Sequence, residues 1–139
     1  MLNPDYEPLI PAGEYRLKLD SHSTAVMFKT PRLILNFSIV DFGDYHQVIV
    51  SRYYCVERLI GKPGRGGKCK HKRRGDFMLE YFSLLPERTR DRLDRVPLEP
   101  LYNSIIIGRV RTVTSNCMQK SLPQQLLYSV VGELIGLES

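Results

Sequence analysis

The chain has 139 residues, three cysteines and a formal net charge of +5, from 20 Lys and Arg against 15 Asp and Glu. Its length is close to the commonest domain size, and no uninterrupted apolar run approaches the roughly 20 residues of a membrane-spanning helix, which excludes a helical membrane protein. An odd number of cysteines without a close pair is a poor disulfide framework and is typical of reduced thiols inside a cell. We therefore expect one soluble domain in the cytoplasm, without a membrane partner.

The N-terminal part of the chain is predicted to pass from an extended arm into a β domain. Three prolines within residues 1–12 deny both helix and strand-ladder hydrogen bonds, so this segment is predicted to be an arm ahead of a single domain at 13–139. Residues 14–20 alternate apolar and polar side chains, which predicts a half-buried strand. Residues 21–31 mix turn formers without a clear period and favour a loop.

Two further β segments, residues 32–40 and 45–54, are predicted to form a hairpin across a turn at 41–44. Alternation directs the larger apolar side chains of the first segment inward: Leu33, Leu35, Phe37 and Ile39. The inward positions of the second segment are then His46, Val48 and Val50. The outer face is expected to consist of Arg32, Ile34, Asn36 and Ser38 with Tyr45, Gln47, Ile49, Ser51 and Tyr53.

The middle of the chain is predicted to hold one helix and one more strand. Apolar residues share one face of a helix over 75–85, with Asp76 as its N-cap. Residues 87–100 alternate charge signs and contain prolines, which is typical of an exposed linker. Residues 104–114 return to β character, with a bend expected at Gly108.

Two structures compete for the C-terminal segment. The run Ser-Leu-Pro-Gln at 121–124 resembles a capping box, and apolar residues recur at helical spacing up to Gly136, so a helix is the first prediction. The alternative is a fifth strand, in which Leu126, Tyr128 and Val130 alternate with other residues.

The segment at 61–74 holds seven of the 20 Lys and Arg residues and none of the acids, which leaves 13 basic and 15 acidic residues elsewhere. Its glycines are expected to keep it supple and to let backbone N–H groups approach phosphates. The concentrated charge predicts a polyanion contact, although such blocks also occur as solvated connections. The cations assigned to this contact are Lys62, Arg65, Lys68, Lys70, Lys72, Arg73 and Arg74.

The expected element order is three strands, a basic loop, a helix, a long connection and another strand. Over roughly residues 13–114 this order resembles the OB-fold, a mainly β, five-stranded barrel with a helix between its third and fourth strands. Within that class the chain resembles the small single-stranded DNA-binding proteins of phages, plasmids and conjugative elements. The likeness lies in the opening Ile-Pro-Ala-Gly-Glu-Tyr, the paired Leu-Ile-Leu-Asn-Phe-Ser-Ile-Val and Tyr-His-Gln-Val-Ile-Val, and the glycine-rich basic insertion.

The resemblance implies oligonucleotide binding through the second and third strands and adjoining loops. Tyr45 and Tyr53 are the leading stacking platforms, because a base stacked on a ring gains roughly 1–3 kcal/mol. Tyr54 or Phe42 would replace them if the register slips by one residue, and ordinary packing of these rings is the alternative. Four other cations are expected to complete a positive groove: Lys29, Arg32, Arg109 and Arg111. Solvation with nearby acidic partners explains Arg109 and Arg111 equally well.

Catalytic and metal-binding patterns are weak. A nucleotide-binding phosphate loop is broken at Lys62, where glycine is required, and at Cys69, where a hydroxyl residue is required. Together with His71, Cys55 and Cys117, Cys69 supplies four zinc ligands by count, but without the close pairs of structural zinc sites. With no triad or nuclease-like constellation, we expect no enzyme activity, no metal and no cofactor.

The sequence therefore predicts a non-enzymatic single-stranded DNA-binding protein of replication or recombination in a mobile element. RNA stays open as a ligand, and a homo-oligomer stays open as a state. The competing hypothesis is a small β-barrel interaction or oligomerisation module whose basic loop docks an acidic partner. That module would use the apolar stripe of a terminal helix at 126–135 to pair chains.

Overall fold

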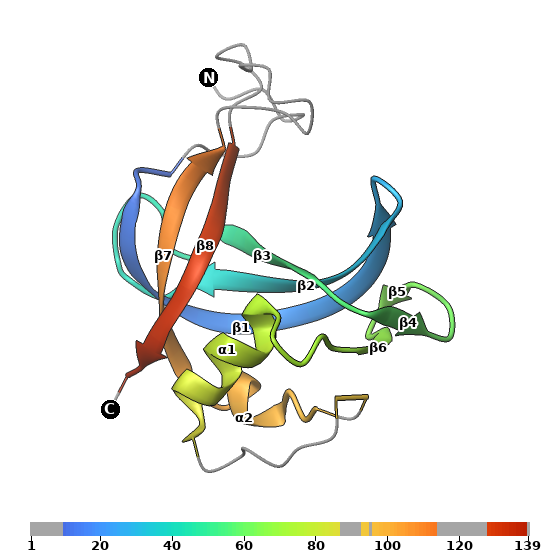
Figure 1. Ribbon diagram of the computed structural model, residues 1–139. Coiled ribbons are helices and arrows are strands. Elements are labelled where there is room, and N and C mark those ends of the chain that lie inside the picture. Colours follow the sequence, from blue (N-terminus) through green and yellow to red (C-terminus); the bar gives the residue numbers. More distant parts are fainter. Residues whose placement is uncertain (1–9, 87–92, 95, 114–127, 139) are drawn as a thin grey trace.

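The computed structural model describes residues 10–86, 93–94, 96–113 and 128–138. Its strands are β1 (Gly13–Met27), β2 (Thr30–Ile39), β3 (Ile49–Cys55), β4 (Arg58–Ile60), β5 (Gly64–Arg65), β6 (Lys68–Lys70), β7 (Ile105–Val113) and β8 (Tyr128–Leu137). Its helices are α1 (Asp76–Leu84) and α2 (Glu99–Tyr102). The fold is mainly β, as expected, with few helices (Figure 1).

One antiparallel sheet organises the molecule. Its strands follow the order β3-β2-β1-β7-β8, while β4 and β6 form a separate two-stranded sheet. Along one edge β1 pairs with β2, and along the other it pairs first with β7, at residues 13–18, and then with β5, at residues 23–24. A bulge between Leu19 and Ser21 separates these two stretches, so β1 curves where it changes partner (Figure 1).

The hydrophobic core lies on one face of this sheet. The four side chains of β2 that were predicted to face inward are all buried: Leu33, Leu35, Phe37 and Ile39. The helix α1 covers the same core with buried side chains of its own: Phe77, Met78, Tyr81 and Leu84. Ile10, within the predicted arm, is also fully buried, and its N–H donates to the Ser129 hydroxyl on β8 at 2.7 Å.

The end strands of the sheet, β3 and β8, lie near one another, but no strand pairing joins them among the described residues. The carboxylate of Glu80, on α1, lies between them. It accepts hydrogen bonds from the Arg52 guanidinium on β3 at 2.5 Å and from the Leu134 N–H on β8 at 2.6 Å. A helix side chain therefore links the two strands where the ladder is open.

The loop predicted at 21–31 is wrong, because β1 continues to Met27 and β2 begins at Thr30. Turn-forming side chains are accommodated in β1 because this stretch has a hydrogen-bonded partner on each edge, β2 and β5. Such pairing overrides local β propensity. Only Phe28 and Lys29 remain as the turn, with φ of 51° and 63°.

The strand predicted at 45–54 begins four residues late, as β3. The Val48 N–H donates to the Tyr45 carbonyl at 3.1 Å within a turn, so Tyr45 and His46 lie outside the strand ladder. The Val48 carbonyl still accepts from the Ile39 N–H of β2 at 3.1 Å. Val50 is the one predicted inward position that lies in the strand, and it is buried. Local turn hydrogen bonds therefore outweigh the β propensity of this segment.

The terminal helix predicted first for 121–136 is wrong over the described residues, where the fifth-strand alternative is confirmed as β8. The part at 121–127 lies outside the described residues. Pairing with β7 runs from Val113 opposite Tyr128 to Ile106 opposite Leu137. This pairing provides hydrogen-bond partners for the backbone groups along one edge of β7, which a helix would leave unpaired. The interaction module loses most of the helical stripe on which it relied.

The other predicted elements are found with small changes. The helix at 75–85 is confirmed as α1, although Gly75 rather than Asp76 occupies the N-cap, which leaves the Asp76 carboxylate in the first turn where the helix dipole favours it. The strand at 104–114 is confirmed as β7 through Val113. The predicted linker contains α2, and its residues 87–92 and 95 lie outside the described part.

Candidate nucleic-acid interface

The basic segment is folded against the sheet. We call residues 58–74 the basic extension, which contains β4, β5 and β6. Besides the pairing of β5 with β1, the Gly66 N–H donates to the His22 carbonyl at 2.8 Å. The buried Thr24 hydroxyl accepts from the Gly64 N–H at 3.4 Å. The extension is thus docked on the edge of β1.

The glycines of the extension have specific positions in this docking. Gly64 and Gly66 adopt φ of 143° and 71°, which L side chains rarely adopt. A Cβ added to Gly67 would lie 2.0 Å from Thr24 Oγ1, so only glycine allows this approach. These glycines therefore serve tight turns and close packing instead of the suppleness expected from the sequence.

Strand register aligns a cation and an aromatic ring in one row across the outer face of the sheet. Arg65 on β5 lies opposite Ser23 on β1. Ser23 lies opposite Ile34 on β2, which in turn lies opposite Tyr53 on β3. Directly opposed residues share a face, and neighbouring strands lie about 4.8 Å apart. The row therefore covers three strand spacings, roughly 14 Å.

The adjacent row of the outer face carries a chain of hydrogen-bonding side chains. The Asn36 amide donates to the Ser21 hydroxyl at 3.1 Å, and the Ser51 hydroxyl donates to the Asn36 amide oxygen at 2.7 Å. Each hydroxyl oxygen and amide keeps further donor or acceptor capacity. This row can therefore hydrogen-bond a ligand that lies across the three strands.

The β1–β2 turn adds exposed apolar side chains beside a lysine. Phe28 and Val26 are 69% and 60% exposed, and Lys29 follows directly. Phe28 and Lys29 both have positive φ, as the two-residue turn between the paired Met27 and Thr30 requires, and this turn projects both side chains from the end of the sheet. Sequence reasoning assigned Lys29 but missed Phe28, although an aromatic next to a lysine before Pro31 was the available signal.

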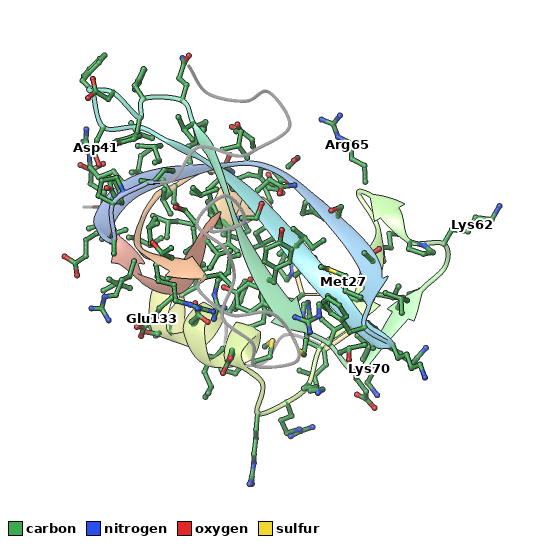
Figure 2. All side chains as sticks on the ribbon, turned by 90° about the horizontal axis from the view of Figure 1, so that it is seen from above. Met27, Asp41, Lys62, Arg65, Lys70 and Glu133 are labelled. Atoms are coloured by element: carbon green, nitrogen blue, oxygen red, sulfur yellow. The ribbon has the colours of Figure 1, made fainter. Side chains whose placement is uncertain are left out.

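The cations of the extension gather at this end of the molecule. Figure 2 shows Lys62, Arg65 and Lys70 around the end of the sheet that carries Met27, with Asp41 at the opposite side. Of the seven cations that the sequence assigned to the contact, six are exposed: Lys62, Arg65, Lys68, Lys72, Arg73 and Arg74. Lys70 is partly buried, and its ammonium lies 3.5 Å from the Glu57 carboxylate.

Arg32 lies on the outer face opposite Cys55 of β3, two residues along β2 from Ile34 in the row that ends at Tyr53. Its Nε is buried and has no hydrogen-bond partner within the described part of the chain. Tyr45, by contrast, is separated from Tyr53, because it lies in the turn before β3 and packs against the core. The structure therefore brings Arg32 to the candidate face and leaves Tyr45 outside it.

Arg109 and Arg111 are also remote from the basic extension. They lie on β7, which pairs with the first residues of β1. The β1–β2 turn and the basic extension lie near the other end of β1, which is 15 residues long. Arg109 is engaged by two carboxylates, at 3.2 Å from Glu133 and 3.7 Å from Glu14. For Arg109 these contacts correspond to the acidic-neighbour alternative. The position of both arginines on β7 leaves them away from the basic extension.

The cysteine and histidine ligands counted for zinc are partly dispersed. Cys69 Sγ and His71 Nε2 lie 3.7 Å apart in the buried interior, whereas Cys55 is exposed on the outer face. Burial raises the pKa of the Cys69 thiol to about 11, which keeps it protonated at neutral pH. Cys117 lies outside the described residues, within which no three metal-capable side chains form a group.

In comparisons with known proteins, no family model, curated protein or solved structure matches the chain. Neither of the two described helices has the length and apolar character to cross a membrane. Because a fold alone does not imply an activity, the residues of the candidate face are the basis for a function.

Proposed function

We propose that this protein is a non-enzymatic single-stranded DNA-binding protein that holds the strand on the outer face of β1, β2 and β3, beside the basic extension. The observation that carries the proposal is the row that aligns Arg65 with Tyr53. Single-strand binders combine cations that follow the phosphates with rings on which bases stack. Such a protein would coat single strands during replication or recombination of a mobile element.

The strand path supports an OB-fold as part of the proposal. Five strands in the order β3-β2-β1-β7-β8, with α1 between β3 and β7 along the chain, fit a small, partly open barrel. In that class the face of the second and third strands and the loop after the first strand bind oligonucleotides. The corresponding regions here carry Tyr53 and Phe28.

Each part of the surface has a distinct role in the proposed complex. Tyr53 and Phe28 stack bases, and the exposed cations of the extension neutralise phosphates. The row formed by Ser21, Asn36 and Ser51 hydrogen-bonds base edges or sugars. Stacking tolerates any base, so little sequence preference is expected, and RNA of equal length is a second ligand because neither contact needs a deoxy sugar.

Fluorescence anisotropy with labelled oligo-dT over a range of salt concentrations tests the proposal. The logarithm of the affinity should fall linearly with the logarithm of salt concentration, by roughly 0.7 for each neutralised phosphate. Equal-length RNA should compete, whereas duplex DNA should compete less well because its bases are not free to stack. No binding at low salt, or stronger competition by duplex, would overturn the proposal.

A second experiment tests the contribution of the basic extension to binding. Replacing Lys70, Lys72, Arg73 and Arg74 together by Ala should lower both the affinity and the steepness of its salt dependence. Unchanged affinity in this variant would reject the role of the extension even if oligo-dT binds.

A further inference from the structure

A cavity of about 610 Å³ lies between the basic extension and the core side of the sheet. Its walls come from three places: the ends of β1 and β2, the β5–β6 part of the extension, and the segment before α2. The volume is within the range of small-ligand sites, roughly 300–1,000 Å³. It is separate from the outer face, because the β1 and β2 side chains that line it point to the opposite side of the sheet.

The walls combine an apolar surface with a few polar groups. Leu33, Val96 and Leu98 supply apolar area. His22 and His71 supply polar rings, Asp94 supplies a carboxylate, and Lys68 supplies a positive charge from the extension. A planar heterocycle with polar edges fits the apolar wall and the polar side chains, and an anion attached to it fits the positive charge of Lys68.

The two imidazoles are both neutral hydrogen-bonding groups at pH 7. Burial lowers the pKa of His71 to about 4 and also lowers the pKa of His22. The His71 ring stacks on Phe77 at 4.0 Å between centroids, and its Nδ1 is buried without a hydrogen-bond partner among the described residues. His22 Nδ1 is held by the Tyr102 hydroxyl at 2.6 Å. His71 Nε2 lies 3.7 Å from Cys69 Sγ. The two rings therefore line the cavity as uncharged, planar groups, which suits a neutral base.

We propose that this cavity binds one nucleotide, with its base between the apolar wall and the histidines and its phosphate at Lys68. The nucleotide is either a free mononucleotide or the terminal nucleotide of a bound strand. The second source depends on the proposed function, since the strand must already lie on the basic extension. The first source is independent of it.

Calorimetric titration with dAMP and with deoxyadenosine tests whether the cavity binds a free nucleotide. Fluorescence of oligo-dT carrying 2-aminopurine at a terminal or a central position tests whether the cavity binds the terminal nucleotide of a bound strand. We expect dAMP to bind more tightly than deoxyadenosine, and the terminal probe to change its fluorescence more than the central probe. Both readings use the full chain without added metal.

Two variants distinguish the cavity from the surrounding charge. Lys68→Ala should weaken dAMP binding at least fivefold while leaving deoxyadenosine unchanged. Lys62→Ala is the matched control, because Lys62 lies in the same extension but does not line the cavity. Val96→Trp should fill the cavity and abolish both readings, with exposed Leu79→Trp on α1 as its control.

The outcomes separate this proposal from the proposed function. If oligo-dT binds but dAMP does not, and the terminal and central probes respond equally, the cavity proposal is overturned and the function stands. If oligo-dT does not bind while dAMP binds in a Lys68-dependent manner, the function fails and the cavity proposal stands for the free ligand. Equal effects of Lys68→Ala and Lys62→Ala overturn the cavity proposal, because they indicate only diffuse charge.

Discussion

The guanidinium of Arg52 and the carboxylate of Glu80 form an ion pair in which the two side chains are only 13% and 11% exposed. Arg52 Nη2 donates to Glu80 Oε2, and Arg52 Nε donates to Glu80 Oε1 at 3.3 Å. The same Oε1 also accepts from the Tyr54 hydroxyl at 3.2 Å and from the Leu134 N–H at 2.6 Å. One side chain of α1 therefore joins β3 to β8, the two end strands of the sheet. This contact keeps the curved sheet together where its hydrogen-bonded ladder is open.

Replacing Glu80 by Ala should lower the free energy of unfolding by about 3–5 kcal/mol, because it leaves the Arg52 charge buried without its partner. Urea denaturation measures this loss. The control is Glu57→Ala, which removes an exposed carboxylate 3.5 Å from the Lys70 ammonium and should cost no more than about 1 kcal/mol. Equal losses in both variants would contradict the role of Glu80 as a link between the strands.

His71 predicts a specific pH dependence of stability. Burial lowers its pKa from 6.5 to about 4 in the folded protein, so below pH 6.5 the unfolded chain binds a proton that the folded chain excludes. Stability should therefore fall as pH drops from 6.5 toward 4, by about 3 kcal/mol, and be insensitive to this group above pH 7. His71→Phe should flatten this part of the profile in urea titrations. A steep fall that persists in the variant would assign the effect to other groups.

Gly67 should not tolerate alanine. The added Cβ would meet the buried Thr24 hydroxyl at 2.0 Å, so the basic extension must move away from β1, at a cost of about 1–3 kcal/mol. Hydrogen exchange should then accelerate in residues 64–67. Gly136→Ala is the matched control, since its Cβ would meet nothing within 4 Å. Adding Thr24→Ala to the Gly67 variant should recover part of the loss, and no recovery would argue against this contact.

The aromatic side chains should contribute to binding according to their position. Tyr53→Ala and Phe28→Ala should each weaken oligo-dT binding by roughly 1–3 kcal/mol through lost stacking. Phe42 is 90% exposed but lies in the turn before β3, stacked on His46, so Phe42→Ala should have little effect. Anisotropy titrations at one salt concentration compare the three variants. A larger loss for Phe42 than for Tyr53 would move the binding surface to the other end of the sheet.

Two arginines on different parts of the sheet should differ in salt dependence. Arg65→Ala should reduce the steepness of the salt dependence of oligo-dT binding by roughly 0.7, because it removes one phosphate contact. Arg109→Ala should leave it unchanged, since Arg109 is paired with Glu133 and Glu14. The measurement is the affinity at four or more salt concentrations. Identical slopes in wild type and Arg65→Ala would remove this residue from the interface.

Short-range pattern was sufficient for part of the fold and of the candidate surface. The alternation in residues 32–40 predicted which side chains of β2 are buried, because successive side chains of a strand point to opposite faces. The positive charge of residues 61–74 and the apolar face of α1 could also be predicted from the sequence, because each depends only on residues close together in the chain. The position of Tyr53 on the outer face followed from the same alternation.

Long-range pairing decided the rest. Residues 21–27 are a strand because β2 and β5 pair with them, and residues 128–137 are a strand because β7 offers an open edge. Neither partner is visible in the local pattern, where turn formers and helical spacing point elsewhere. The sequence by itself determined a mainly β chain with one strongly basic segment. Only the tertiary structure decided that this segment docks on β1 and aligns Arg65 with Tyr53, because register is a property of paired strands and not of either strand alone.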